Sequence, residues 1–233
     1  MSKNEISILS TKNLSGNLIE YAASNGILLE CIPFIKIEPA NLNLNIDKFL
    51  DKNIAVVFTS MNSVKIIANQ LTNSISWKIY CIGHATKVEV LKYFSKENIV
   101  ATADYGEDLA DKIILNGERE ILFFCGSLRR DVIPDKMAAH GINVTEIVVY
   151  NTFKTPVSLP KKYSAVLFFS PSGVDSFFSI NKLNSAIAVA IGTTTAAELK
   201  KFTNQNIIIS KIPSVESMIN SLIELKDSKQ LLC

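Results

Sequence analysis

The sequence is poor in the residues that usually bind metals or perform thiol chemistry. It has only two histidines, His84 and His140, and its four cysteines form no C-x-x-C pair. We therefore expect neither a histidine-rich metal site nor a histidine-based hydrolase. Three of the cysteines lie in apolar runs typical of strands, which predicts buried, reduced thiols in a cytoplasmic protein. The chemistry is expected to come from hydroxyls, amides, carboxylates, phenols or basic side chains.

The sequence also lacks long apolar runs and blocks of like charge. No run reaches the roughly 18 residues of a membrane span, and residues 1–5 are not followed by a segment typical of a signal peptide. The 24 basic and 22 acidic residues give a net charge of +2, without the basic face or tail of a nucleic-acid-binding protein. We therefore expect no membrane partner and no nucleic-acid partner, and we expect a monomer.

Nucleotide-binding signatures are missing too. The sequence contains no G-x-x-x-x-G-K-[ST] phosphate loop and no G-x-G-x-x-G dinucleotide motif. A nucleotide-using transferase is therefore the weakest of the functions that we consider.

What the sequence does have is an alternation of short apolar runs and helical stretches. Hydrophobic residues make up 48% of the 233 residues, which is enough for a substantial core. Runs typical of strands lie at 6–9, 27–37, 55–58, 78–82, 99–101, 121–124, 144–149, 166–169, 188–191 and 207–209. Near-continuous apolar strands between helices predict an α/β fold in which helices cover both faces of parallel sheets.

The sequence contains an internal repeat. Residues 55–64 align with 165–174, 82–86 with 191–195 and 98–99 with 206–207, at offsets of 108 to 110. A looser match pairs 26–30 with 141–146 at an offset near 115. Two copies of one α/β unit explain these matches more simply than a solenoid does.

Two linker-like stretches occupy matching places in the repeats. Segments 38–53 and 151–163 contain prolines, and each follows the second strand of a unit. If the chain crosses between two domains at both places, the domains flank a cleft suited to a ligand. One continuous sheet with surface loops at the same places fits the pattern equally well.

Small hydroxyl-rich turns follow the strands of both copies. At the carboxyl ends of parallel strands, helix N-termini expose N–H groups with a partial positive charge, and hydroxyls add further donors. Each residue alone is more simply a helix cap, but the whole set predicts several anion sites and a polyanionic ligand. The candidate binding residues are Ser60, Asn62, Gly83, Thr86, Gly126, Ser170, Ser172, Gly173, Gly192, Thr194, Thr195 and Ser214.

Basic and phenolic residues stand beside these turns. Arg129 and Arg130 follow the turn at Gly126, and Lys12 follows the first strand. Because a helix N-terminus disfavours cations, their presence there hints at a compensating anion, although solvated surface positions are the simpler alternative. Tyr150 ends the strand 144–149, either as a half-buried packing residue or as a phenol that donates a hydrogen bond or a proton.

Taken together, these segments resemble the uroporphyrinogen-III synthase family. The resemblance is carried by FCGSLRRDVIP at 124–134, VYNT at 149–152, FFSPSGV at 168–174, AIGTTTA at 190–196, VFTS at 57–60 and CIGHAT at 81–86. These motifs follow the family's order and spacing from end to end. The resemblance implies two similar α/β domains joined by a two-stranded connector. The expected first domain comprises 1–35 and 155–233, the second comprises 42–148, and the linkers are 36–41 and 149–154.

The resemblance also implies a reaction. Members of this family cyclise hydroxymethylbilane, a linear tetrapyrrole with eight carboxylates, without a cofactor or a metal. Water is lost and ring D is inverted through a spiro intermediate. Tyr150 is then the candidate catalytic residue, and Lys12, Arg129 and the turn residues would hold the carboxylates. Hand-over of the bilane from the upstream bilane-forming enzyme is a further expectation. A non-catalytic, two-lobed sensor of small anions is the alternative function.

Overall fold

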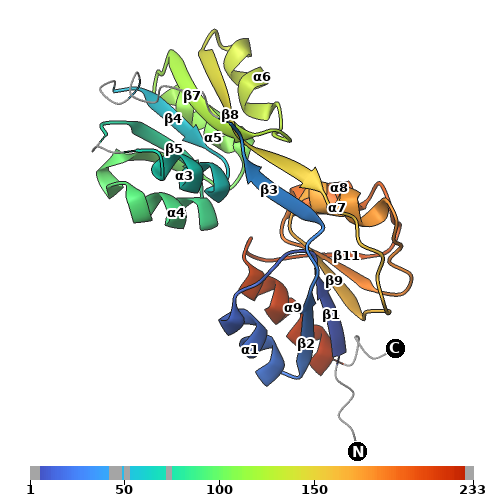
Figure 1. The fold of residues 1–233 in the computed structure, drawn as a ribbon. Coiled ribbons are helices and arrows are strands. Elements are labelled where there is room, and N and C mark those ends of the chain that lie inside the picture. The colour runs from blue at the N-terminus through green and yellow to red at the C-terminus, as the bar shows by residue number, and fades with distance from the viewer. Residues whose placement is uncertain (1–5, 42–48, 50–52, 72–74, 229–233) are drawn as a thin grey trace, which may run out of the picture. The chain divides into compact units, whose positions relative to one another are not determined.

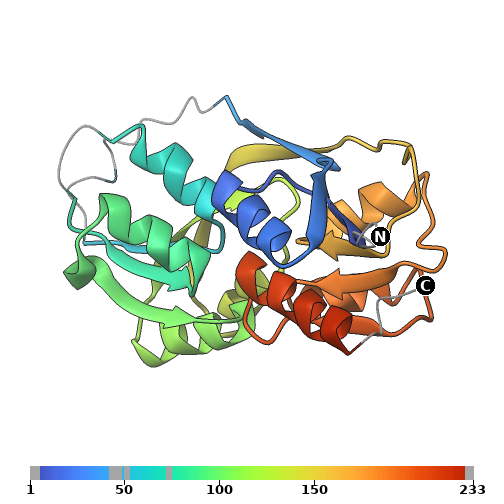
Figure 2. The same ribbon diagram turned by 90° about the horizontal axis from the view of Figure 1, so that it is seen from below.

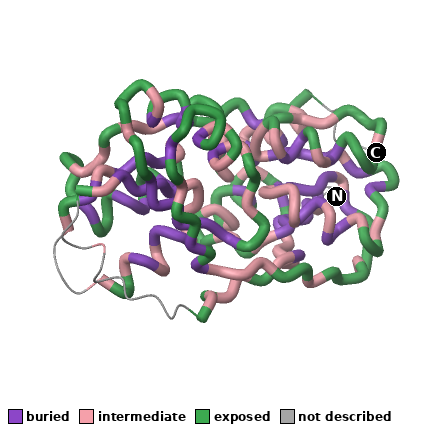
Figure 3. The backbone as a smooth tube through the Cα atoms, turned by 90° about the horizontal axis from the view of Figure 1, so that it is seen from above, coloured by how far each residue is buried: buried purple, intermediate pink, exposed green. Residues whose placement is uncertain are grey.

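A computed structural model describes residues 6–41, 49, 53–71 and 75–228 (Figure 1). The chain divides into two compact units. Unit 1 comprises Met1–Lys36 and Phe153–Cys233, and unit 2 comprises Ile37–Thr152. In each unit the buried residues, purple in Figure 3, are concentrated in the inner segments. No helix in the described part of the chain is long and apolar enough to cross a membrane.

Unit 1 is a five-stranded sheet with helices on both faces. Its strands, in the order β11-β10-β9-β1-β2, are β11 (Ile207–Ile209), β10 (Ile187–Ala190), β9 (Ala165–Phe168), β1 (Ile6–Ser10) and β2 (Ile27–Cys31), and all neighbours are parallel. Helices α1 (Gly16–Ser24) and α9 (Val215–Asp227) lie side by side on one face (Figure 2). Helices α7 (Pro171–Phe178) and α8 (Thr193–Leu199) cover the other face.

Unit 2 is a six-stranded sheet with the same layering. Its strands, in the order β3-β8-β7-β4-β5-β6, are β3 (Ile35–Pro39), β8 (Asn143–Lys154), β7 (Glu120–Gly126), β4 (Ala55–Phe58), β5 (Lys78–Ile82) and β6 (Ile99–Ala103). Neighbours from β8 to β6 are parallel. Helices α3 (Met61–Ala68) and α4 (Ala85–Tyr93) cover one face, and α5 (Gly106–Leu115) and α6 (Val132–Ala139) cover the other. A short 3₁₀ helix, Lys96–Asn98, precedes β6.

The central strands show why the sequence forms these layers. All four residues of β4 are buried, and so are all four residues of β9. Val56 and Phe58 belong to the core beneath α3 and α4, whereas Ala55 and Val57 belong to the core beneath α5 and α6. A strand that is covered on both faces needs apolar residues at every position. The predicted α/β fold with parallel sheets is confirmed.

The internal repeat corresponds to a shared topology. The order β2-β1-β9-β10-β11 in unit 1 matches β8-β7-β4-β5-β6 in unit 2. The sequence matches pair β4 with β9, β5 with β10 and β6 with β11, as this alignment of the sheets requires. The two units differ in chain order, because β1 and β2 come first in unit 1 whereas β7 and β8 come last in unit 2.

The prediction of a single strand at 27–37 is wrong. The structure has two strands there, β2 in the sheet of unit 1 and β3 in the sheet of unit 2. Pro33 has no N–H to donate to a ladder, and the side chain of Phe34 is fully buried in the core beneath α7 and α8. These two residues end the strand and turn the chain.

Strands β3 and β8 cover most of the segments predicted as linkers, 36–41 and 149–154. They are hydrogen-bonded neighbours, and just beyond β3 the Ala40 N–H donates to the Val149 carbonyl at 2.9 Å. The prediction that the strand ends at Val149 is wrong, because β8 continues to Lys154. Tyr150 therefore lies inside a strand.

Candidate active site

The predicted site residues lie where strands end and helices begin. In unit 1 they follow β1 (Lys12), β9 (Ser170, Ser172, Gly173), β10 (Gly192, Thr194, Thr195) and β11 (Ser214). In unit 2 they follow β4 (Ser60, Asn62), β5 (Gly83, Thr86) and β7 (Arg129), with Gly126 ending β7 and Tyr150 in β8. Because these strands are parallel, each set gathers at the carboxyl edge of its own sheet, where α/β proteins usually bind ligands.

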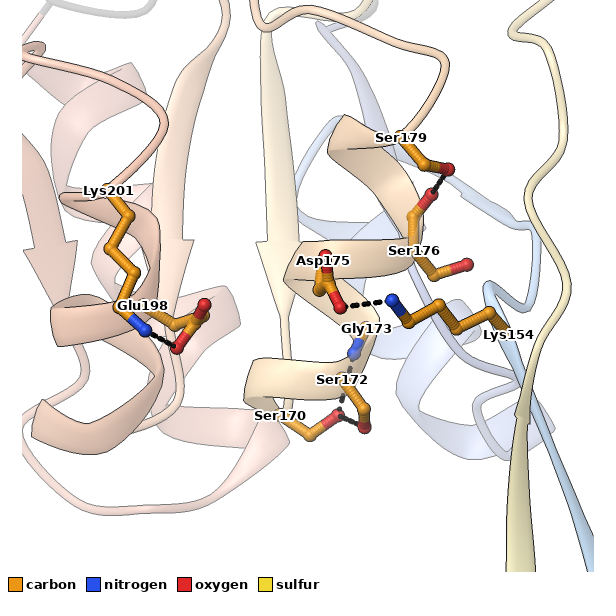
Figure 4. A network of polar contacts seen from close by, with 9 residues as sticks. All are labelled: Lys154, Ser170, Ser172, Gly173, Asp175, Ser176, Ser179, Glu198 and Lys201. Carbon is orange, nitrogen blue, oxygen red and sulfur yellow. Dashed lines mark hydrogen bonds and ion pairs between the residues drawn. The ribbon is translucent and has the colours of Figure 1, made fainter. Parts of the chain in front are cut away.

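Three of the predicted hydroxyls cap helices. The Ser60 Oγ accepts the Asn62 N–H of α3 at 3.2 Å, and the Ser214 Oγ accepts the N–H of Ser217 in α9 at 3.1 Å. The Ser170 Oγ accepts the Gly173 N–H of α7 at 3.1 Å (Figure 4). The capping role is therefore confirmed, and each hydroxyl is held at a helix N-terminus.

Around Ser170, further polar contacts order the start of α7. The Ser170 and Ser172 hydroxyls are 3.1 Å apart, and Asp175 forms an ion pair with Lys154 at the end of β8 (Figure 4). A Cβ on Gly173 would lie 3.3 Å from the Ser170 Oγ. The glycine therefore leaves room for the capping hydroxyl, beside the first-turn N–H groups, which could donate hydrogen bonds to an anion.

The turn after β5 contains a histidine that the sequence reasoning did not select. His84 occupies the N-cap position of α4 with a positive φ of 54°, which is uncommon for a residue other than glycine. Its Nε2 lies 3.3 Å from the Asp104 Oδ1. A Cβ on the preceding Gly83 would come within 3.0 Å of the same Oδ1. Gly83 thus stands beside a carboxylate, and Thr86 is buried in the first turn of α4.

Arg129 is neutralised by the protein's own acids. Its guanidinium forms ion pairs with Asp131 and with Glu146 of β8, and these contacts raise the pKa of Arg129. Helix α6 begins at Val132, so Arg129 precedes the helix. The compensating anions that the position of Arg129 predicts are thus the carboxylates of Asp131 and Glu146. A ligand carboxylate would have to displace one of them.

Lys12 is the strongest basic candidate. Its Nζ lies 4.2 Å from the ring centroid of Phe169, and burial lowers the pKa of Lys12. Among the described residues, no carboxylate forms an ion pair with this ammonium group. A partly buried cation held only against an aromatic face is suited to an incoming carboxylate.

Tyr150 lies directly over Gly126. A Cβ on Gly126 would be 2.4 Å from the Cε2 and Cζ atoms of the tyrosine and 2.7 Å from its Oη. Burial raises the pKa of Tyr150, and a side-chain hydrogen bond with Ser60 acts in the opposite direction. The net shift is upward. The phenol is protonated at neutral pH, as in an ordinary tyrosine, and can donate a hydrogen bond or a proton.

The backbone at Tyr150 and just after it is hydrogen-bonded to the turn after β7. The Ser127 N–H donates to the Tyr150 carbonyl at 2.9 Å, and the Thr152 N–H donates to the Ser127 Oγ at 3.1 Å. Ser127 belongs with Gly126 to one of the hydroxyl-rich turns that the sequence predicts as anion sites. In the structure its side chain and its N–H are both used by the backbone of β8.

A pocket of about 450 Å³ lies elsewhere in unit 1. Its lining includes Lys161, Tyr163, Phe177 and Leu183, around the loops that precede β9 and β10. None of the predicted site residues lines it. In the described part of the chain, no group of three or more histidine, cysteine, aspartate or glutamate residues is placed to hold a metal ion.

Comparisons with known proteins agree with one another. A family model described as uroporphyrinogen-III synthase HemD matches residues 17–220. The uroporphyrinogen-III synthase of Saccharomyces cerevisiae is 27% identical over 222 residues, covering 79% of each chain. The uroporphyrinogen-III synthase of Schizosaccharomyces pombe is 26% identical over 159 residues, covering 62% of this chain and 61% of the S. pombe protein.

Solved structures share the fold. Uroporphyrinogen-III synthetase from Helicobacter pylori superposes with a TM-score of 0.65 at 20% identity, covering 94% of this chain and 99% of the other. A mutant uroporphyrinogen III synthase from Thermus thermophilus superposes with a TM-score of 0.64 at 12% identity, covering 97% and 99%.

Proposed function

Because the chain belongs to the uroporphyrinogen-III synthase family, we propose that it is a lyase that cyclises hydroxymethylbilane to uroporphyrinogen III. The reaction expels water and inverts ring D through a spiro intermediate. The observation that carries the proposal beyond family membership is the protonated Tyr150 phenol at the carboxyl edge of unit 2, among the predicted turns. A non-catalytic anion sensor gains no support from the comparisons.

The reaction demands control of geometry more than activation. Loss of the terminal hydroxyl gives an electrophilic azafulvene, and unassisted closure yields the symmetric type I ring. The enzyme must present the substituted carbon of ring D instead, so that the spiro intermediate forms, fragments and closes again with that ring inverted. Positioning of this kind can contribute several kcal/mol to the rate.

Tyr150 assists the first step in this proposal. Its phenol donates a hydrogen bond or a proton to the departing hydroxyl, which leaves as water. The phenol is protonated at physiological pH, as in an ordinary tyrosine, and burial raises the pKa of Tyr150 further. The leaving group is intrinsically reactive, so we expect loss of the phenol to slow the reaction without abolishing it.

The carboxylates of the bilane are held by Lys12 and the capped turns. Lys12 lacks an acidic partner among the described residues, and Ser60, Ser170 and Ser214 hold their hydroxyls at helix N-termini. Several such contacts can bind a polyanion without a large net positive charge. Arg129 would bind a substrate carboxylate only if that carboxylate displaced Asp131 or Glu146 from the guanidinium.

The remaining expectations are part of the same proposal. The linkers at 36–41 and 149–154 would form the two-stranded connector through β3 and β8, which are hydrogen-bonded neighbours. The protein would work as a monomer in the cytoplasm, consistent with its free Cys31, Cys81 and Cys125. It would use no cofactor and would receive its substrate from the upstream bilane-forming enzyme.

An isomer assay tests the proposal. Hydroxymethylbilane is generated in situ, the protein is added, the products are oxidised, and type I and type III uroporphyrin are separated by chromatography. We expect predominantly type III, rising with protein concentration. Type I alone, as in the blank, would refute the activity. Tyr150→Phe should slow type III formation with an unchanged melting temperature, and a wild-type rate in this variant would remove Tyr150 from the mechanism.

A further inference from the structure

The repeat places a tryptophan of unit 2 and an alanine of unit 1 at equivalent positions. Lys78 of β5 and Ile187 of β10 lie opposite the first residues of the matching strands β4 and β9. Their N–H groups donate to the carbonyl of the residue just before β4 or β9, at 2.9 and 3.0 Å. The residues that directly precede them, Trp77 and Ala186, are therefore equivalent as well.

These two residues fill their places differently. The Trp77 side chain is buried in the core beneath α3 and α4, with its ring centroid 5.8 Å from that of Phe124. Ala186 belongs to the matching core beneath α7 and α8, but its side chain is a single methyl group. It lines the pocket of about 450 Å³ in unit 1. A pocket thus opens in unit 1 at the position where unit 2 holds an aromatic ring.

Asn181 holds two walls of this pocket together. Its Oδ1 accepts the Leu159 N–H of the loop before β9 at 3.1 Å, and its Nδ2 donates to the Val157 carbonyl at 2.9 Å. Its own N–H donates to the Phe177 carbonyl of α7 at 3.0 Å. The chain itself therefore fixes the shape of the pocket, which lowers the entropic cost of ordering the site around a ligand.

The rim of the pocket is basic. The exposed side chains of Lys161, Lys162 and Lys182 line it, and its described lining contains no aspartate or glutamate. Glu30 neutralises Lys161, with 2.9 Å between the Oε2 and the Nζ. Among the described residues, no carboxylate forms an ion pair with Lys162 or Lys182. Two cations therefore remain beside a pocket whose base is formed by buried apolar residues.

We propose that this pocket is a binding site for a small aromatic anion, whose ring enters the place that an indole fills in unit 2 and whose charge meets Lys162 and Lys182. The lining loops precede β9 and β10, whereas the candidate active-site residues of unit 1 follow the strands. The site is therefore separate from the proposed reaction, and its ligand should not compete with the bilane.

Fluorescence titration with anilinonaphthalene sulfonate, an aromatic anion, tests the site. We expect saturable binding to one site with a Kd below about 1 mM. Ala186→Trp should abolish this binding, because it adds the ring that unit 2 has at this position. Ala186→Leu fills part of the same space and should weaken binding, and it serves where the tryptophan variant does not fold. Absence of saturable binding, or unchanged binding in a folded Ala186 variant, would overturn the proposal.

Neutral lysine variants test the rim. Lys162→Gln and Lys182→Gln should each weaken binding about 2- to 5-fold, as expected for one exposed ion pair. Lys200→Gln is the matched control, because this exposed lysine of unit 1 does not line the pocket, and it should keep the wild-type affinity. Equal weakening in all three variants would show a response to net charge alone and would overturn the proposal.

Two further measurements locate the probe. In amide spectra of isotope-labelled protein, the shifts on binding should be concentrated at 159–163 and 180–186, and Lys12→Met should leave the affinity for the probe unchanged. Shifts concentrated around Ser170, or loss of binding in Lys12→Met, would place the probe in the candidate active site and overturn the proposal. The isomer assay decides the proposed function separately, because none of these titrations uses the bilane.

Discussion

Replacement of Gly126 by alanine is the most direct perturbation of the reactive phenol. The added Cβ would stand 2.4 Å from two carbons of the Tyr150 ring, whereas non-bonded carbons normally approach to about 3.5 Å. The ring must therefore move by about 1 Å. The backbone restricts this movement, because Ser127 is hydrogen-bonded to the Tyr150 carbonyl and to the Thr152 N–H.

The size of the effect follows from this overlap. Overpacking of this kind costs about 1–3 kcal/mol, which corresponds to a melting temperature about 2–12 °C lower in a chain of this length. Misplacement of a catalytic group by about 1 Å can reduce a rate by up to about 100-fold. We expect Gly126→Ala to approach the rate of Tyr150→Phe, because both variants lose the productive phenol.

The assay combines thermal melting with the isomer assay. Gly16→Ala is the matched control, since a Cβ there meets nothing within 4 Å and the residue begins α1 in unit 1, whereas Gly126 and Tyr150 belong to unit 2. This control should keep both the rate and the melting temperature. In a Tyr150→Ala background, Gly126→Ala should no longer destabilise, because the ring that it meets is gone. Equal destabilisation in both backgrounds would refute the reasoning.

Three further predictions concern other parts of the chain. Lys12→Met should raise KM for the bilane about tenfold through loss of one charge-assisted contact. It should not unfold the protein, since the partly buried ammonium has no acidic partner among the described residues, and an unchanged KM would contradict its role. Tyr80→Phe should cost about 1.5–3 kcal/mol in urea unfolding, because the fully buried phenol donates to the Glu118 carboxylate at 2.8 Å, and full stability would speak against this bond. Burial raises the pKa of Cys81 and Cys125 to about 11, so unfolded thiols ionise first and stability should fall as the pH rises from about 9 towards 11. At pH 8 a thiol reagent should label these two residues only on unfolding, and rapid labelling of the native protein would contradict their burial.

The sequence predicts the layers and the edge of the sheets where the candidate set lies. Continuous apolar runs such as 55–58 and 165–168 identify strands that are covered on both faces, and the repeat identifies which strands correspond. The hydroxyls of Ser60, Ser170 and Ser214 predict helix caps, because only a few side chains can accept hydrogen bonds from the exposed N–H groups of a helix N-terminus.

Other features depend on pairing between distant strands, which a pattern along one strand does not contain. Strand β8 has a bulge at Val149 that arises from its register against β7, and no residue in 143–154 marks it. Gly126 is predicted as an anion turn, but its spatial neighbour Tyr150 lies 24 residues away. Glu146, the partner of Arg129, is likewise distant in the sequence. At 27–37, hydrophobicity alone conceals the division into two sheets.

The adjacency of β3 and β8 has a consequence for how the polypeptide acquires its structure. Unit 1 cannot be completed until the ribosome has delivered β9 to β11, whereas unit 2 is a contiguous insertion. Once unit 2 has folded, its entry and exit strands are paired. The loop that separates β1 from β9 then shrinks from more than 150 residues to about 40 effective residues, and its closure becomes easier by about 1 kcal/mol. The folded unit 2 thus brings the two segments of unit 1 close together without a covalent bond. This favours an order of folding in which unit 2 forms first.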